Sequence, residues 1–415
     1  MSKLTFNDCN GLAGFMSLGF VNTGMEMNVR TGTLDFGNKV AEVNRHLLGD
    51  NWSSFFSDDP NEWPDQQADV VLGCPPCSGW SVWSGPANRG VDARAHEHTQ
   101  AFMKYAARVK PKIIIFECVQ QAYSQGRETM VKYRDMVEEL SGKQYDIYHV
   151  KMNNLQVGGF SYRPRYFWTA VEKGMPFGAQ AVSPEKMPTL MDVIGDLKDL
   201  EISWDPQPYG TAPSSYVSHL VNTSGVVDGH MNKQNKEAQR IKEIFDILGN
   251  DEWKQMMPID HALRAAVAKN NNMFPQAWLD QEEKIRSRDF DLGFSIPCRW
   301  SESSWCHVLT GGALDHVIHP VLERRITHRE AARIQGLPDN WKFSEVKTYS
   351  ALSATWGKAV AVQAAEWIAK AAKAALEGSP NGPQGELIGD REWLISTDVG
   401  FSRKTVKDKW YTNKN

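Results

Sequence analysis

Two short runs of apolar residues place the strongest constraint on how this chain of 415 residues can fold. Residues 70–73 read Val-Val-Leu-Gly, and residues 113–116 read Ile-Ile-Ile-Phe. Apolar side chains at every position, rather than at every second position, are typical of strands buried on both faces of a parallel sheet. The sequence therefore predicts an α/β fold in which helices cover both sides of a doubly wound sheet.

Chemically reactive side chains follow both runs. Cys77 lies on a proline-containing loop directly after the first run, and Glu117 is the residue after the second. Because ligands bind at the carboxyl ends of strands in doubly wound sheets, we expect these two side chains to share one pocket. A thiolate and a partly desolvated acid can attack a ring covalently and donate a proton elsewhere on it. Cys77 is thus a candidate nucleophile.

The pair Cys74 and Cys77 also permits other interpretations. A Cys-x-x-Cys pair is found in redox sites and in half of a zinc site. A zinc site would need a second pair, and Cys298 with Cys306 has the wrong spacing. A redox pair normally opens a helix, whereas both intervening residues here are proline. A redox, metal or purely structural role for these cysteines stays an alternative.

The residues around Cys77 and Glu117 resemble the DNA cytosine-5 methyltransferase family, of prokaryotic or phage type. The family's Pro-Pro-Cys loop matches residues 75–77, and its Glu-Asn-Val motif matches residues 117–119, with Cys118 in place of Asn. Three further segments are similar to the family's eighth, ninth and tenth motifs, namely residues 153–168, 319–339 and 357–362. The tenth motif carries Lys358 in place of Asn.

The resemblance implies a catalytic set of one thiol, one acid and two arginines. The thiolate would add to carbon 6 of cytosine, while the acid hydrogen-bonds the ring nitrogen and the exocyclic amine. The arginines alternate along an extended segment, so their guanidinium groups point to one face and can hold the base. The expected catalytic residues are Cys77, Glu117, Arg163 and Arg165.

The resemblance also implies S-adenosylmethionine as the cofactor. The loop at residues 11–14 looks like the family's first motif, but Cys9 replaces a Phe and Ala13 replaces a Gly. Asp35 is the candidate for the ribose hydroxyls, with Thr33 as the competing alignment. For the adenine amine, Asp58 and Asp59 are both candidates. The predicted cofactor contacts are Gly11, Leu12, Gly14, Asp35, Asp58, Pro76, Ala359 and Val360.

Two segments have the composition expected of a DNA contact. Residues 78–94 are rich in glycine and contain tryptophan and arginine, as a loop that closes over a substrate requires. Residues 180–320 lose regular periodicity, apart from an amphipathic helix expected at 237–248, and correspond to the family's target-recognition domain. The predicted DNA contacts are Ser81, Trp83, Arg89, Arg94, Arg288, Arg299 and Arg324.

These segments predict four parts of the chain. Residues 1–180 form the catalytic domain, with a Rossmann-like sheet, and 181–320 form the smaller, irregular target-recognition domain. Residues 321–376 return to complete the catalytic domain, and 377–415 form a linker and tail of unknown role.

The composition narrows the choice of partners. A formal net charge of −4 excludes a uniformly basic protein, so DNA binding must depend on local basic clusters. Six cysteines in this length do not form a disulfide framework and favour a reducing cytoplasm. No apolar run approaches the ~20 residues that span a membrane. We expect a monomer that needs no metal.

The predicted reaction is methyl transfer to carbon 5 of a cytosine flipped out of double-stranded DNA, as in restriction-modification systems. An RNA cytosine-5 methyltransferase of the same fold would keep the same catalytic residues. A catalytically silent regulator that binds DNA is a second alternative, to which the altered first motif lends support. An enzyme that alkylates free pyrimidine nucleotides is a third, although it would not need a recognition domain.

Overall fold

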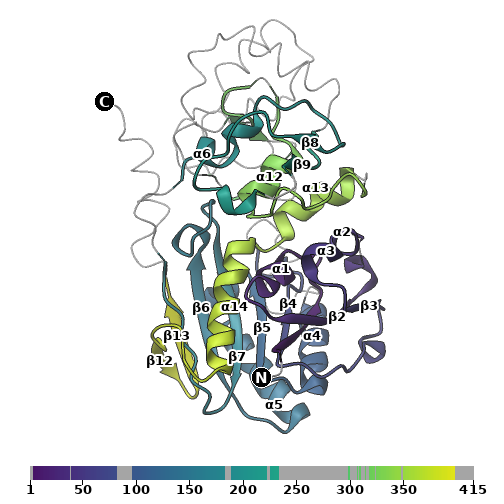
Figure 1. The fold of residues 1–415 in the computed structure, drawn as a ribbon. Coiled ribbons are helices and arrows are strands. Elements are labelled where there is room, and N and C mark those ends of the chain that lie inside the picture. The colour runs from purple at the N-terminus through teal and green to yellow at the C-terminus, as the bar shows by residue number, and fades with distance from the viewer. Residues whose placement is uncertain are drawn as a thin grey trace, which may run out of the picture. The chain divides into compact units, whose positions relative to one another are not determined.

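The computed structural model describes residues 3–37, 39–81, 96–182, 188–221, 225–232, 298–299, 306, 308–309, 314, 317–322, 324–346 and 349–397 (Figure 1). The chain divides into two compact units. The first comprises Met1–Glu185 and Lys358–Asn415, and the second comprises Lys186–Gly357. The chain therefore leaves the first unit and later re-enters it.

The first unit contains a nine-stranded sheet of order β12-β13-β6-β7-β5-β4-β1-β2-β3. All neighbouring strands from β5 to β3 are parallel, whereas β7 is antiparallel to both β5 and β6. The strands are β1 (Thr5–Cys9), β2 (Glu26–Gly32), β3 (Ser53–Phe56), β4 (Val70–Gly73), β5 (Ile113–Cys118), β6 (Tyr145–Asn153), β7 (Pro164–Glu172), β12 (Glu386–Gly389) and β13 (Glu392–Ser396).

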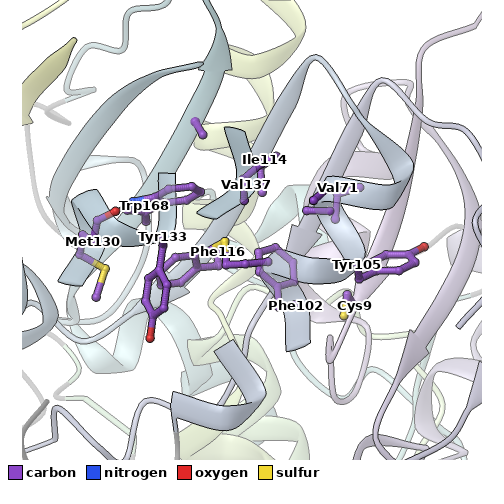
Figure 2. Close-up of a cluster of buried hydrophobic side chains, with 14 of the residues drawn as sticks. Cys9, Val71, Phe102, Tyr105, Ile114, Phe116, Met130, Tyr133, Val137 and Trp168 are labelled. Carbon is purple, nitrogen blue, oxygen red and sulfur yellow. Dashed lines mark hydrogen bonds between the residues drawn. The ribbon is translucent and has the colours of Figure 1, made fainter. Parts of the chain in front are cut away.

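Helices cover both faces of this sheet, as the two apolar runs predicted. On one face, α4 (His96–Val109) packs against α5 (Gln121–Ser141) over a cluster of buried side chains (Figure 2). On the other, α1 (Phe15–Val21) packs against α14 (Val362–Leu376). The runs are apolar at every position because β4 and β5 are buried along their whole length. The predicted α/β fold class is confirmed.

Two short helices lie in the crossover between β2 and β3. They are α2 (Val40–Val43) and α3 (Arg45–Leu48), with Asn44 between them. The Asn44 side chain donates a hydrogen bond to the Val40 carbonyl at 2.8 Å and so competes with the helical backbone pattern.

Residues 386–396, which lie in the expected tail, form a hairpin that joins the sheet. Strand β13 pairs in parallel with β6, and β12 pairs antiparallel with β13. Glu392 of β13 accepts a hydrogen bond from Arg127 at 2.5 Å and contacts His149 at 2.8 Å. These long-range contacts attach the hairpin to the first unit.

The second unit is built from short elements. Its helices are α6 (Leu190–Ile194), α12 (His328–Ile334) and most of α13 (Tyr349–Lys358). Short strand pairs join β8 (Gln207–Pro208) to β9 (Val226–Val227) and β10 (Cys298–Arg299) to β11 (Val317–Ile318). The helix expected at residues 237–248 lies outside the described residues.

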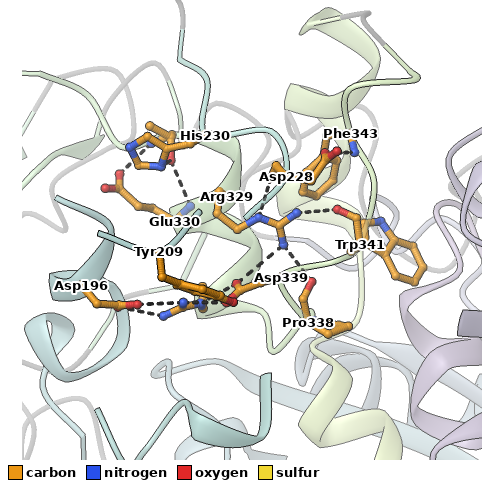
Figure 3. A network of polar contacts seen from close by, with 12 residues as sticks. Asp196, Tyr209, Asp228, His230, Arg329, Glu330, Pro338, Asp339, Trp341 and Phe343 are labelled. Atoms are coloured by element: carbon orange, nitrogen blue, oxygen red, sulfur yellow. Dashed lines mark hydrogen bonds and ion pairs between the residues drawn. The ribbon is translucent and has the colours of Figure 1, made fainter. Parts of the chain in front are cut away.

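A buried network of ions fixes the ninth-motif segment within the second unit (Figure 3). Arg333 of α12 forms ion pairs with Asp196 at 2.9 Å and with Asp339 at 2.6 Å. Arg329 donates to the Asp228 carbonyl at 2.7 Å. Because these partners belong to the second unit, residues 321–357 lie in it, although the sequence placed them in the return segment.

Candidate active site

Adjacent parallel strands bring the predicted nucleophile and acid to the same edge of the sheet. Gly73 at the end of β4 pairs with Phe116, the residue before Glu117 on β5. Cys77 follows on the loop after β4, where a turn forms between its carbonyl and the amide of Trp80 at 3.0 Å. The neighbouring Cys74 thiol donates to Glu117 Oε2 at 3.5 Å. The loop and the acid thus lie together.

Glu117 is buried and paired with one of the two predicted arginines. Arg165 Nε lies 2.7 Å from Glu117 Oε1. Glu117 is opposite Phe167 in the antiparallel pairing of β5 and β7, so Arg165 projects from the same face two residues along. The Arg165 cation holds Oε1 of the Glu117 carboxylate in place. The other oxygen, Oε2, accepts a hydrogen bond from the Cys74 thiol, which is a weak donor.

The second arginine joins the eighth motif to the tenth. Arg163 is fully buried, and its Nη2 donates to the Ala359 carbonyl at 2.7 Å. Burial, and then the neighbouring Arg165 cation, lower the pKa of Arg163 to about 9. At neutral pH Arg163 therefore still carries its charge. Val360, the other predicted contact in the tenth motif, is also buried.

The pKa values of the Cys77 and Cys74 thiols are shifted in opposite directions. A hydrogen bond with the Cys118 thiol lowers the pKa of Cys77, and Arg165 and Arg163 act in the same direction against the effects of burial and of the Glu117 charge. Burial and the Glu117 charge instead raise the pKa of Cys74 well above its usual value. Of the two thiols, Cys77 is the one whose surroundings favour the nucleophilic thiolate.

Cys118 is the site residue that sequence reasoning missed. In the sequence, Cys118 stood out only because the family has Asn at this position. In the structure its buried thiol lies at the end of β5 and forms a hydrogen bond with Cys77. Burial raises the pKa of Cys118 well above its usual value, so Cys118 keeps its proton and can donate it in that bond.

The loop after Cys77 is held in place by an aromatic contact. Trp80 is buried, and its ring packs directly against Gly126. A Cβ at position 126 would stand only 2.3 Å from that ring, so the contact requires glycine. Gly126 interrupts the helical geometry of α5 at this point. Ser81 and Pro76 are described, whereas Trp83, Arg89 and Arg94 lie outside the described residues.

The first-motif loop is a tight turn at the end of β1. Gly11 lies so close to Asp8 that a Cβ would stand 1.9 Å from its carboxylate, and Gly14 precedes α1 with a φ of 82°. Asn10 Nδ2 and Thr33 Oγ1 are buried without a hydrogen-bond partner among the described residues. The carboxyl ends of β1 and β2 therefore carry polar atoms that a ligand can satisfy.

The structure separates the acidic residues proposed for the cofactor. Asp58 Oδ1 accepts a hydrogen bond from the Leu34 amide at 3.1 Å, so Asp58 lies against the segment that follows β2. Asp59 instead accepts from the Asn61 amide at 2.9 Å and caps a turn of 3-10 helix, η2 (Pro60–Glu62). Asp35 is exposed, whereas Thr33 is buried.

The predicted DNA contacts in the second unit are only partly described. Arg324 pairs with Glu330 at 2.7 Å, an internal contact, and its role on DNA stays a prediction. Arg299 lies on β10, and Arg288 lies outside the described residues.

The described part of the chain contains neither a metal-binding cluster nor a membrane-spanning helix. No group of three His, Cys, Asp or Glu side chains there is arranged to hold a metal ion. Within the same residues, no helix has the length and apolar character needed to cross a membrane.

The order of the strands and the helices on both faces of the sheet define a fold of the Rossmann-like class that methyltransferases share. A prophage-encoded protein of E. coli, described as a DNA modification methyltransferase, has a similar structure with a TM-score of 0.63 at 18% identity, covering 90% of this chain and 100% of that one. This similarity shows the shared fold.

The chain belongs to the C-5 cytosine-specific DNA methylase family, whose model matches residues 9–374. It is 26% identical to the type II methyltransferase M.NgoPII of Neisseria gonorrhoeae, over 90% of this chain and 95% of the relative. It is 24% identical to M.DdeI of Desulfomicrobium norvegicum, over 70% and 68%. The resemblance predicted from the motifs is confirmed, and the chain is a DNA cytosine-5 methyltransferase.

Proposed function

We propose that this enzyme methylates carbon 5 of a flipped cytosine in double-stranded DNA through a covalent bond between Cys77 and carbon 6. The observation that carries this proposal is the contrast between the two loop thiols. Of these two thiols, only Cys77 has a lowered pKa, and its hydrogen bond with Cys118 is the largest cause. Cys77 also lies beside a carboxylate that is already paired with Arg165.

The residues of the first-motif loop and of β2 fit S-adenosylmethionine, which supplies a methyl group on a sulfonium when bound. Its ribose hydroxyls can pair with the unpartnered polar atoms of Asn10 and Thr33, which are buried at the strand ends. Gly11 has no room for a side chain, because a Cβ there would stand 1.9 Å from Asp8 Oδ1, so only glycine keeps this tight turn. The proposed contacts are Gly11, Leu12, Gly14, Asp35, Asp58, Pro76, Ala359 and Val360.

The reaction needs a covalent step because carbon 5 of cytosine is a weak nucleophile. The Cys77 thiolate adds to carbon 6, and Glu117 hydrogen-bonds the ring nitrogen and the amine, where charge develops. Carbon 5 then has the character of an enamine and takes the methyl group. Loss of the carbon 5 proton and expulsion of Cys77 restore the aromatic ring.

Neither ring carbon is accessible within a stacked duplex, so the base must leave the helix to reach Cys77. Arg165, whose guanidinium already pairs with Glu117, can contact the flipped base, while Arg163 connects the pocket to Ala359. We further propose that the enzyme acts as a monomer in the cytoplasm on double-stranded DNA.

The test is to incubate the protein with S-adenosylmethionine and unmodified genomic DNA, digest the DNA, and measure 5-methyldeoxycytidine by mass spectrometry. We expect a signal that disappears with Cys77→Ser and persists with Cys74→Ala. DNA containing 5-fluorocytosine should trap the wild type, but not Cys77→Ser, as a covalent complex. Methylation of RNA alone, or turnover by Cys77→Ser, would overturn the proposal.

A further inference from the structure

The first-motif loop contains two residues other than glycine in the left-handed region. Asn10 has a φ of 60° and Leu12 a φ of 45°. Asparagine tolerates this region well, because its short polar side chain can bond locally, but leucine avoids it. Something in the surrounding structure must therefore stabilise the backbone at Leu12.

Arg30 of β2 supplies such a contact. Its side chain is 1% exposed, and its Nη2 donates to the Leu12 carbonyl at 2.7 Å. A buried arginine is costly unless it is paired, so its presence beneath the loop calls for a structural or functional reason.

The Arg30 guanidinium is fixed from several sides. Its Nε lies 3.6 Å from Asp8 and its Nη1 lies 3.9 Å from Glu42. The rings of Trp52 and Phe56 lie 5.7 and 5.6 Å from its central carbon. Because these partners belong to β1, α2, β3 and the residue before β3, the position of the cation is set by elements outside the loop.

We propose that Arg30 is a positioning residue that holds Leu12 in its left-handed conformation and so preforms the loop for S-adenosylmethionine. This inference rests on the cofactor use proposed above.

The test is a mutant cycle read by the binding of S-adenosylhomocysteine in isothermal titration calorimetry. All variants carry Asp8→Asn, so that removing Arg30 leaves no buried carboxylate unpaired. In this background Arg30→Met should weaken binding at least about tenfold. When Leu12→Gly is also present, the same change should cost less than about threefold, because glycine adopts the left-handed region without help.

Arg45→Met is the matched control. Arg45 also pairs with Glu42, at 2.9 Å, and lies over Trp52, at 3.7 Å, but the structure shows no contact from it to the described loop residues. Arg45→Met should change the affinity for S-adenosylhomocysteine by less than about twofold. If Arg30→Met does not fold, as judged by thermal melting, Arg30→Lys replaces it, since lysine keeps the buried charge. Leu12→Asn is the second rescue variant.

The outcomes separate the two proposals. Equal losses from Arg30→Met with and without Leu12→Gly, or no loss at all, would overturn the role of Arg30 while leaving cofactor use intact. A wild-type protein that binds neither S-adenosylhomocysteine nor S-adenosylmethionine would overturn the proposed cofactor use, and the role of Arg30 with it. Coupling of about threefold or more between the two sites supports the proposal.

Discussion

Two buried arginines, Arg163 in the first unit and Arg333 in the second, have pKa values shifted in opposite directions. Burial, and then Arg165, lower the pKa of Arg163 to about 9. Burial acts on Arg333 as well, but the carboxylates of Asp339 and Asp196 outweigh it and raise the pKa of Arg333. The same side chain therefore has different electrostatic surroundings in the two units.

The difference lies in how completely each cluster satisfies its own charges. Around Arg333, both oxygens of Asp339 accept hydrogen bonds from the guanidinium, at 2.6 and 2.7 Å, and Tyr209 adds another. Around Arg163, two cations face Glu117, whose second oxygen has, among the described residues, only a thiol donor at 3.5 Å. A saturated network stabilises a fold, whereas an unsaturated one can still bind a substrate.

The strongest test of this contrast is Cys77→Ser. We expect turnover to fall by more than about 10³-fold, because the hydroxyl is not ionised at neutral pH and cannot replace the thiolate. DNA binding and the melting temperature should change little. Turnover is measured as 5-methyldeoxycytidine and binding by a gel-shift assay. A variant that loses DNA binding to the same extent would contradict a purely chemical role.

Arg333→Met should have the largest effect on stability. It leaves Asp196 and Asp339 buried without their cation, and breaking such a pair costs about 3–5 kcal/mol. Urea denaturation measures the loss. Lys342→Met is the control in the same unit, since Lys342 forms an exposed pair with Glu345 and should change stability by less than about 1 kcal/mol. Similar effects of the two changes would refute the importance of the buried network.

Arg165→Lys should affect catalysis more than stability. Lysine keeps the charge near Glu117 but presents a single ammonium in place of the planar guanidinium that fixes the carboxylate and reaches the base. We expect the methylation rate to fall about 10- to 100-fold with little change in thermal melting. A large fall in melting temperature at unchanged activity would instead place Arg165 with the structural arginines.

Cys118→Ala should shift the pH dependence of the reaction. The Cys118 hydrogen bond lowers the pKa of Cys77, so its removal raises that pKa and moves the rising limb of the pH–rate profile to higher pH. At neutral pH we expect the reaction to be roughly fivefold slower, because one hydrogen bond contributes about 1 kcal/mol. Cys118→Asn restores a donor and should return the profile toward the wild type, whereas an unshifted profile in Cys118→Ala would contradict this role.

Cys74→Ala should have the smallest effect. The pKa of the Cys74 thiol is raised, mainly by burial, and this thiol forms only a weak hydrogen bond with Glu117. We expect activity within about threefold of the wild type under reducing conditions, measured by the same nucleoside analysis. An inactive Cys74→Ala variant would revive the interpretation of the two loop cysteines as a functional pair.

The sequence predicted those parts of the molecule that local patterns determine. Strands β4 and β5 are apolar throughout because both faces are buried, and a doubly wound sheet then places Cys77 and Glu117 at one edge. The Thr-x-x-Glu spacing of Thr327 and Glu330 is also a local pattern, and these two residues form a capping box at the start of α12.

What could not be predicted depends on contacts between distant residues. The thiol of Cys118 gains its role from the approach of Cys77, and Arg30 looks like an ordinary strand residue until its carbonyl partner at Leu12 is known. The hairpin at residues 386–396 is held by Arg127 and His149, far away in the sequence, so its own composition did not reveal it.

That hairpin has a consequence for how the protein is made. Because β13 covers β6, a chain emerging from the ribosome presents an unpaired sheet edge from the synthesis of β6 until residues 392–396 appear. The whole second unit is translated within that interval. The catalytic sheet is therefore completed only after the second unit has been translated, and any chain that stops before β13 keeps an open strand on which other unfinished chains can assemble.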